Sequence, residues 1–114
     1  MRAKKESGKR KRLCVVLVTA SSRKEARMIA QAVLKAKLAA CVNIVPGVES
    51  HYWWQGKLET AAEFLLIVKS TRRHFPKLAK LVRARHSYQT PEIIALPVVA
   101  ADKAYADWWC HSLG

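Results

Sequence analysis

The sequence predicts an α+β domain of the ferredoxin-like, split βαβ type, in which one antiparallel sheet carries two helices on one face. Three observations lead to this prediction. The apolar periodicity follows the order strand, helix, strand, strand, helix, strand. A glycine-containing turn joins the two central strands, which makes them a hairpin. A chain of 114 residues is long enough for one domain with one hydrophobic core.

The first twelve residues differ from the rest of the chain. They contain seven basic residues and one acidic residue, and they end in Gly8-Lys-Arg-Lys-Arg12. Such a segment either binds polyanions such as nucleic acid through phosphate contacts or serves as a solvated tail. We expect a disordered basic arm over residues 1–12, with the solvated tail favoured over nucleic-acid binding, and a folded domain over residues 13–114.

The folded part begins with a strand and a helix. Residues 13–20 are almost purely apolar and rich in β-branched side chains, which is typical of a buried strand. Ser22-Arg-Lys-Glu25 then forms a capping-box pattern, in which Ser22 accepts from a first-turn amide and Glu25 reaches back. Apolar residues follow at helical spacing to about residue 37: Ala26, Ile29, Ala30, Val33 and Leu34.

A long hairpin follows. Residues 40–55 form a strand that should kink at Pro46-Gly47, because proline cannot donate to a ladder and glycine tolerates a bulge. Gln55-Gly56-Lys57 supplies a tight turn into a second strand that ends near Ser70.

The remaining elements are a second helix, a strand and a short helix. Residues 71–85 have apolar side chains at helical spacing, with Pro76 in the first turn, where proline is tolerated. Residues 92–100 form the fourth strand. A terminal helix covers residues 102–110, with Asp102 as its cap.

Several strands are apolar on both faces: residues 14–18, 64–68 and 93–96. Two helices can cover only one face of the sheet, and the other would expose more apolar surface than a monomer usually tolerates. We therefore expect the chain to bury this face against copies of itself. Tyr52, Trp53 and Trp54, near the end of the hairpin, are the candidate interface residues.

Composition also bears on compartment. No apolar stretch approaches the ~20 residues of a membrane-spanning helix, and Ser22 to Glu25 interrupt the apolar run that imitates a signal peptide. The three cysteines contain no Cys-x-x-Cys pair, which argues against a disulfide framework and a structural zinc site. We expect a cytoplasmic protein with no membrane association.

Chemistry-bearing residues are few. No nucleotide-binding, nucleophile-elbow or helical zinc motif is found, so we expect no enzyme activity. A cleft of Lys69, His86, Tyr88, Glu92 and Trp53 would suit a small anionic or metal-bearing ligand. The same groups could instead make ordinary ion pairs and hydrogen bonds that close an interface between copies.

Two segments carry a family resemblance. Residues 41–57 read Cys-Val-Asn-Ile-Val-Pro-Gly-Val-Glu-Ser-His-Tyr-Trp-Trp-Gln-Gly-Lys, and residues 86–97 read His-Ser-Tyr-Gln-Thr-Pro-Glu-Ile-Ile-Ala-Leu-Pro. In this order and spacing they resemble the CutA family, small trimeric proteins linked to divalent-cation tolerance, over residues 14–109. The resemblance implies a homotrimer, with the hairpin reaching onto neighbours, and a role in the response to metal ions.

The resemblance also bears on copper. The copper ligands attributed to bacterial relatives are a cysteine in the first strand and two adjacent histidines before the Tyr-Gln-Thr-Pro-Glu stretch. The matching positions here are Val18, Arg85 and His86. One imidazole is not enough for a copper site, which needs thiolate or several imidazoles. We expect at most weak binding of a divalent metal such as copper, through His86.

An alternative function comes from fold analogy. A ferredoxin-like trimer also resembles the nitrogen-regulatory PII proteins, which bind small molecules in clefts. Lys69 and the net charge of +13 favour a small anion as the ligand of such a sensing or scaffold module. The sequence therefore leaves two functions open: divalent-cation tolerance and anion sensing.

Overall fold

The computed structural model describes residues 12–114. The predicted basic arm falls almost wholly on residues 1–11, which lie outside this part. The elements follow in chain order: β1 (Leu13–Ala20), α2 (Arg23–Lys35), β2 (Cys41–Trp54), β3 (Lys57–Thr71), α3 (Phe75–Arg85), β4 (Ile93–Pro97) and α4 (Lys103–His111).

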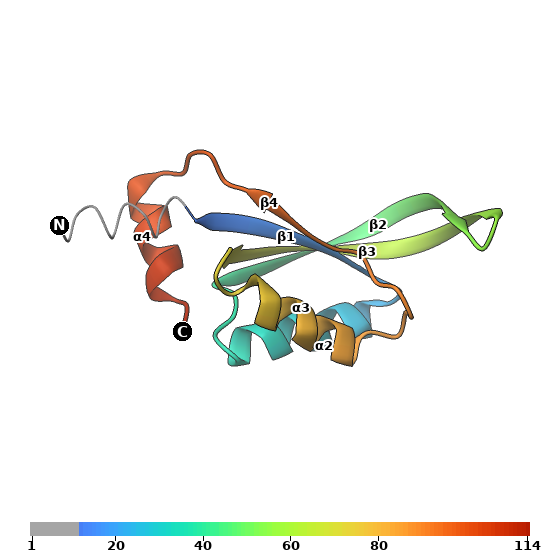
Figure 1. Cartoon of the computed structure of the whole chain (residues 1–114), viewed down its shortest axis with the longest axis horizontal. Coiled ribbons are helices and arrows are strands. Elements are labelled where there is room, and N and C mark those ends of the chain that lie inside the picture. The colour runs from blue at the N-terminus through green and yellow to red at the C-terminus, as the bar shows by residue number, and fades with distance from the viewer. Residues whose placement is uncertain (1–11) are drawn as a thin grey trace.

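The four strands form one antiparallel sheet in the order β2-β3-β1-β4. Helices α2 and α3 lie side by side on one face of this sheet (Figure 1). The strand order and the shared helical face confirm the predicted split βαβ topology.

The core lies between the sheet and these two helices. Val16, Val18 and Leu66 from the sheet meet Ile29 of α2 and Leu78 of α3, and all five are 0% exposed. This layer is therefore complete within one subunit.

The hairpin of β2 and β3 extends well beyond the helices, and the molecule measures 53 × 25 × 23 Å (Figure 1). The register between its strands shifts between Val45 and Val48, at the predicted kink. Gly47 there has φ 76°, a left-handed conformation that glycine adopts without steric cost. Gln55 and Gly56 form the predicted turn with φ values of 49° and 79°, as in a type I′ turn.

Three predicted boundaries are wrong. Helix α2 ends at Lys35 rather than near residue 37, where Lys37 already has φ 60°. Helix α3 begins at Phe75 rather than residue 71, because Thr71 still pairs with Leu13 in the sheet. Strand β4 ends at Pro97 rather than residue 100, because its partner β1 begins at residue 13 and offers no further ladder.

The face of the sheet opposite α2 and α3 is apolar. Leu17, Ile67 and Ile94 form a row across three strands, and Leu96 lies in the next row. Ile94 and Leu96 are each nearly half exposed. Helix α4 lies at one end of the sheet (Figure 1). It packs there through Trp109, whose indole donates to the Ser70 carbonyl at 2.9 Å. We call the rest of this surface, which includes Leu17, Ile67, Ile94 and Leu96, the open face.

Candidate functional site

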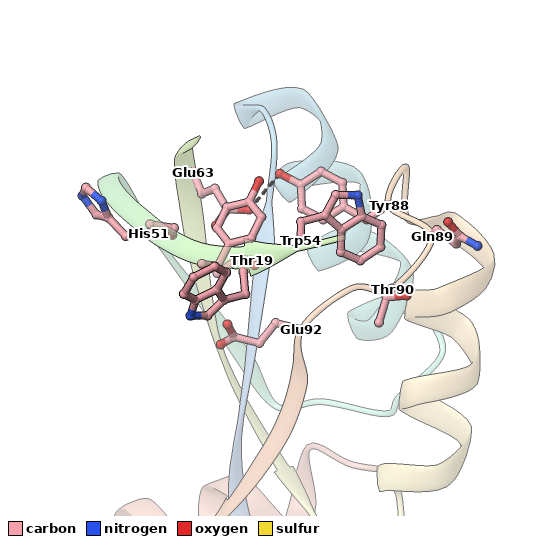
Figure 2. Close-up of a pocket in the computed structure, with 11 residues that line it drawn as sticks. Thr19, His51, Trp54, Glu63, Tyr88, Gln89, Thr90 and Glu92 are labelled. Atoms are coloured by element: carbon pink, nitrogen blue, oxygen red, sulfur yellow. Dashed lines mark hydrogen bonds between the residues drawn. The ribbon is translucent and has the colours of Figure 1, made fainter. Parts of the chain in front are cut away.

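A pocket of about 690 Å³ lies between the hairpin and the loop that precedes β4. The hairpin contributes Tyr52, Trp53, Trp54 and Glu63, and the loop contributes Tyr88 and Glu92: these six residues carry its chemistry. Figure 2 shows Glu63, Tyr88 and Glu92 around this space. The structure therefore brings together three of the predicted cleft residues, Trp53, Tyr88 and Glu92.

Glu63 is the buried acid of this pocket. It is only 6% exposed, and one carboxylate oxygen accepts a hydrogen bond from the Tyr88 hydroxyl at 2.8 Å (Figure 2). Burial and this bond raise the pKa of Tyr88, so the phenol remains a donor. Within residues 12–114, no lysine, arginine or histidine forms an ion pair with Glu63. A carboxylate buried without a cation is costly unless something compensates its charge.

The second acid is Glu92. Desolvation by the pocket walls raises its pKa, and the nearby Glu63 carboxylate raises it further. The aromatic wall beside the two acids is open to solvent, with Trp53 70% and Trp54 41% exposed. Two acids beside π-faces form an environment that attracts cations rather than anions.

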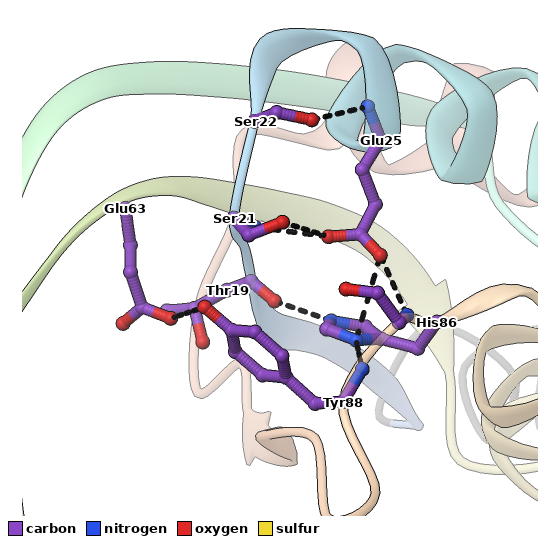
Figure 3. A network of polar contacts seen from close by, with 8 residues as sticks. Thr19, Ser21, Ser22, Glu25, Glu63, His86 and Tyr88 are labelled. Atoms are coloured by element: carbon purple, nitrogen blue, oxygen red, sulfur yellow. Dashed lines mark hydrogen bonds and ion pairs between the residues drawn. The ribbon is translucent and has the colours of Figure 1, made fainter.

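His86 lies behind the pocket and lines none of it. Its side chain is 0% exposed, Nε2 lies 2.6 Å from the Thr19 carbonyl, and Nδ1 accepts from the Tyr88 amide at 3.0 Å (Figure 3). Because a carbonyl can only accept and an amide N–H can only donate, Nε2 donates to Thr19 and Nδ1 offers its lone pair to Tyr88. Both nitrogens are used, so the prediction of His86 as a metal ligand does not fit this geometry.

Glu25 holds the loop that contains His86. One carboxylate oxygen accepts from the amide and hydroxyl of Ser21, both at 2.9 Å, and the other accepts from the Ser87 amide at 2.6 Å (Figure 3). Burial alone would raise the pKa of Glu25, but the bonds from Ser21 and Ser87 outweigh it and lower the pKa to about 2. The capping-box prediction is thus half right. Ser22 does cap the helix, accepting from the Glu25 amide at 3.1 Å, whereas Glu25 bonds to Ser21 and the loop.

Lys69 does not reach the pocket, so this part of the predicted cleft is wrong. It shares strand parity with Glu63 but lies six residues along β3, about 20 Å away at strand rise. Its ammonium donates to the Asn43 side chain and lies 4.0 Å from the Cys41 sulfur.

The other positions that match family copper ligands are also unsuited to metal. Val18 is fully buried in the core, and Arg85 is exposed at the end of α3. In the described residues, no three or more His, Cys, Asp or Glu side chains cluster closely enough to hold a metal ion. None of the helices described over residues 12–114 has the length and apolarity to span a membrane.

Two important residues were missed by sequence reasoning. Glu63 is not among the cleft residues predicted from the sequence, although an acid beside Phe64-Leu-Leu-Ile-Val68 is a signal of a buried carboxylate. Glu25 was interpreted as a local cap, and its contact with Ser87 spans 62 residues, which no local pattern can reveal.

Comparison with known proteins places this arrangement in a family. The family model described as CutA1 divalent ion tolerance protein matches residues 14–112. The divalent-cation tolerance protein CutA of Thermus thermophilus is 49% identical over 100 residues, covering 88% of this chain and 97% of that protein. The chloroplastic protein CutA 1 of Oryza sativa is 46% identical over 98 residues, covering 86% of this chain and 55% of the rice protein.

Solved structures agree with these matches. The divalent cation tolerance protein from Thermus thermophilus superposes with a TM-score of 0.87 at 48% identity, covering 90% of this chain and 99% of that one. The periplasmic divalent cation tolerance protein CutA from Archaeoglobus fulgidus superposes with a TM-score of 0.85 at 43% identity, covering 88% of this chain and 97% of that one. The resemblance predicted from the two sequence segments is confirmed, and the chain belongs to the CutA1 divalent ion tolerance protein family.

Proposed function

We propose that this chain acts in divalent-cation tolerance as a homotrimer, and that cations meet it at the pocket carboxylates Glu63 and Glu92. The observation that carries the proposal is Glu63, a buried carboxylate with no ion-pair partner within residues 12–114. Desolvation raises the pKa of the neighbouring Glu92, and the Glu63 carboxylate raises it further. A cation beside the two carboxylates would relieve both the repulsion and the desolvation.

The expected affinity is low. Two carboxylates are fewer ligands than a dedicated divalent site uses, so a complete site needs water or groups from a second copy. Carboxylate oxygens favour hard ions, whereas copper prefers thiolate or several imidazoles, and the pocket lining contains one imidazole, His51, and no cysteine. We therefore expect copper to bind weakly, with the carboxylates of Glu63 and Glu92 as its ligands in place of His86.

The assembly is supported by surfaces that one subunit leaves bare. The open face exposes Ile94 and Leu96, and the hairpin exposes Trp53 and Leu58 at about 70% each. Burying large apolar side chains contributes ~1.5–3 kcal/mol each, so several per subunit would hold copies together firmly. The predicted interface residues Tyr52, Trp53 and Trp54 are all exposed and available for such contacts.

For the compartment, we propose the cytoplasm. Cys14 and Cys41 are free thiols, which suits a reducing compartment. Relatives are named chloroplastic or periplasmic, so this fold serves more than one compartment. Fractionation of the native host with an antibody tests this: recovery with periplasmic or organellar markers would contradict it.

The anion-sensing alternative has lost its main support. Lys69, which motivated it, lies about 20 Å along β3 from Glu63. The pocket carries two carboxylates, which would repel an anionic ligand.

Isothermal titration of copper, zinc and manganese into the wild-type protein and three variants tests the cation proposal. We expect Glu63→Gln and Glu92→Gln to lose most of the binding heat, because each removes one of the two charges. His86→Gln should bind as wild type does, since His86 lies outside the pocket. Equal isotherms for the wild type and both glutamine variants of the pocket would refute the role of the carboxylates.

A further inference from the structure

The two helices that cover the sheet form a strongly basic surface. Residues 23–37 and 72–85, which contain α2, α3 and the turns beside them, carry eleven basic side chains, and all eleven are exposed. We call this surface the basic helix face; it consists of Arg23, Lys24, Arg27, Lys35, Lys37, Arg72, Arg73, Lys77, Lys80, Arg83 and Arg85. The only acidic residue in these segments is Glu25, which is buried and bonded to Ser21 and Ser87.

In the described chain, the acidic residues other than Glu25 lie away from the two basic helices. The six other acidic residues lie on the hairpin, on the loop before β4, or at α4: Glu49, Glu59, Glu63, Glu92, Asp102 and Asp107. Within residues 12–114, no ion pair involves any member of the basic helix face. The guanidinium of Arg23 lies over the Phe64 ring, 5.1 Å from its centroid. A surface that needed only solubility would mix both signs, whereas a single-sign surface attracts an oppositely charged partner.

The basic segment at the start of the sequence joins the domain at this same surface. The Arg12 carbonyl accepts a hydrogen bond from the Arg72 amide at 2.9 Å, just before α3. The segment that ends at Arg12, residues 1–12, contains seven basic residues. The last residue of the basic segment, Arg12, is therefore bonded to Arg72, a member of the basic helix face.

We infer that the basic helix face binds the phosphate backbone of double-stranded nucleic acid without reading its sequence. Among the exposed large hydrophobic residues, only Met28 lies on α2 or α3. The face thus lacks the aromatic side chains that stack on unpaired bases, and the apolar side chains that insert into a membrane surface. What remains is charge alone, which is what non-specific duplex binding uses.

The dimensions suit this partner. Helix α2 has 13 residues, a length of about 20 Å, along which a duplex presents roughly twelve phosphate charges. The basic helix face is on the opposite side of the sheet from the open face (Figure 1). It therefore stays accessible if copies associate through the open face, and this inference does not depend on the proposed cation function.

The test measures anisotropy of a labelled mixed-sequence duplex of about 24 base pairs, between roughly 50 and 200 mM salt. The full-length wild type is compared with Arg27→Gln/Lys80→Gln on the basic helix face. The matched control is Lys57→Gln/Lys103→Gln, which removes the same charge from the hairpin tip and α4. We expect the face pair to weaken binding about tenfold and to reduce the salt slope by about two, with the control pair close to wild type.

Two further variants and a binding assay with phosphatidylserine vesicles complete the test. Lys24→Gln/Lys77→Gln repeats the result on other residues if the first pair is poorly folded. Lys9→Gln/Arg10→Gln/Lys11→Gln should weaken binding but leave the difference between face and control pairs intact. Four outcomes would each overturn the inference. The two pairs could show equal salt slopes, or the wild type could fail to bind the duplex. The triple variant could lose all binding, or the protein could bind only to phosphatidylserine vesicles.

Discussion

The two faces of the sheet differ in what they need in order to be buried. The face under α2 and α3 is closed within one subunit, where Val16, Leu66 and Leu78 are fully buried. The open face and the hairpin also carry large apolar side chains, yet Trp53 and Leu58 of the hairpin remain about 70% exposed. One half of the fold is thus buried by the chain itself, and the other half leaves large apolar side chains exposed. The pocket lies on the second half.

The largest effect is expected at the proposed contact between copies. Trp53→Ala should cost about 3–5 kcal/mol per site, as for buried aromatic residues generally, if a neighbouring copy covers this side chain. Sedimentation velocity over a dilution series should then show dissociation at concentrations where the wild type stays assembled. An unchanged mass and melting temperature would remove Trp53 from the interface.

A core substitution should behave differently. Leu66→Ala leaves a cavity under the helices and should cost about 2–5 kcal/mol, which thermal unfolding followed by circular dichroism would measure. Because Leu66 faces α2 and α3, the mass below the melting temperature should remain that of the wild type. Dissociation without a drop in melting temperature would contradict the separation of the two halves.

Glu25 connects the helical half to the pocket loop. Glu25→Gln should cost about 2 kcal/mol, because the charge-assisted bonds from Ser21 and Ser87 weaken. The folded-state pKa, about 2, is below the ordinary value of 4.5, so this stabilisation is present above pH 4.5 and is lost as the pH falls toward 2. Urea unfolding of both proteins across this range measures it. Exposed Glu59→Gln serves as the control, and a constant difference between wild type and Glu25→Gln down to pH 2 would contradict the assignment.

The smallest effect is expected at the hairpin turn. Gly56 has φ 79° and open space around its Cα, so Gly56→Ala introduces only backbone strain, about 1 kcal/mol. Gly56→Asn should recover part of this loss, because asparagine tolerates the left-handed conformation. Equal stability of the alanine variant and the wild type in thermal unfolding would show that the turn relaxes freely.

The fold could be predicted from the sequence wherever the cause is local. The kink at Pro46-Gly47, the turn at Gly56 and the cap at Asp102 all follow from the residue at that position. The open face could also be predicted, because strands that are apolar on both parities need two partners.

The candidate site could be predicted only in part. Tyr88 and Glu92 were placed together correctly because they lie on one short loop. Lys69 was wrongly joined to them, since strand parity fixes the face of a side chain but not its distance along the strand. The burial of His86 depends on Thr19 and Tyr88, and contact with a strand 67 residues away has no signature in sequence.

The central claim is that the open face and the hairpin are buried between copies of the chain. Native mass spectrometry or sedimentation equilibrium of the full-length protein at micromolar concentration tests it most directly. We expect a single species of three 12.9 kDa chains, about 39 kDa, that persists on dilution. A stable, soluble species of 12.9 kDa at the same concentration would contradict the account.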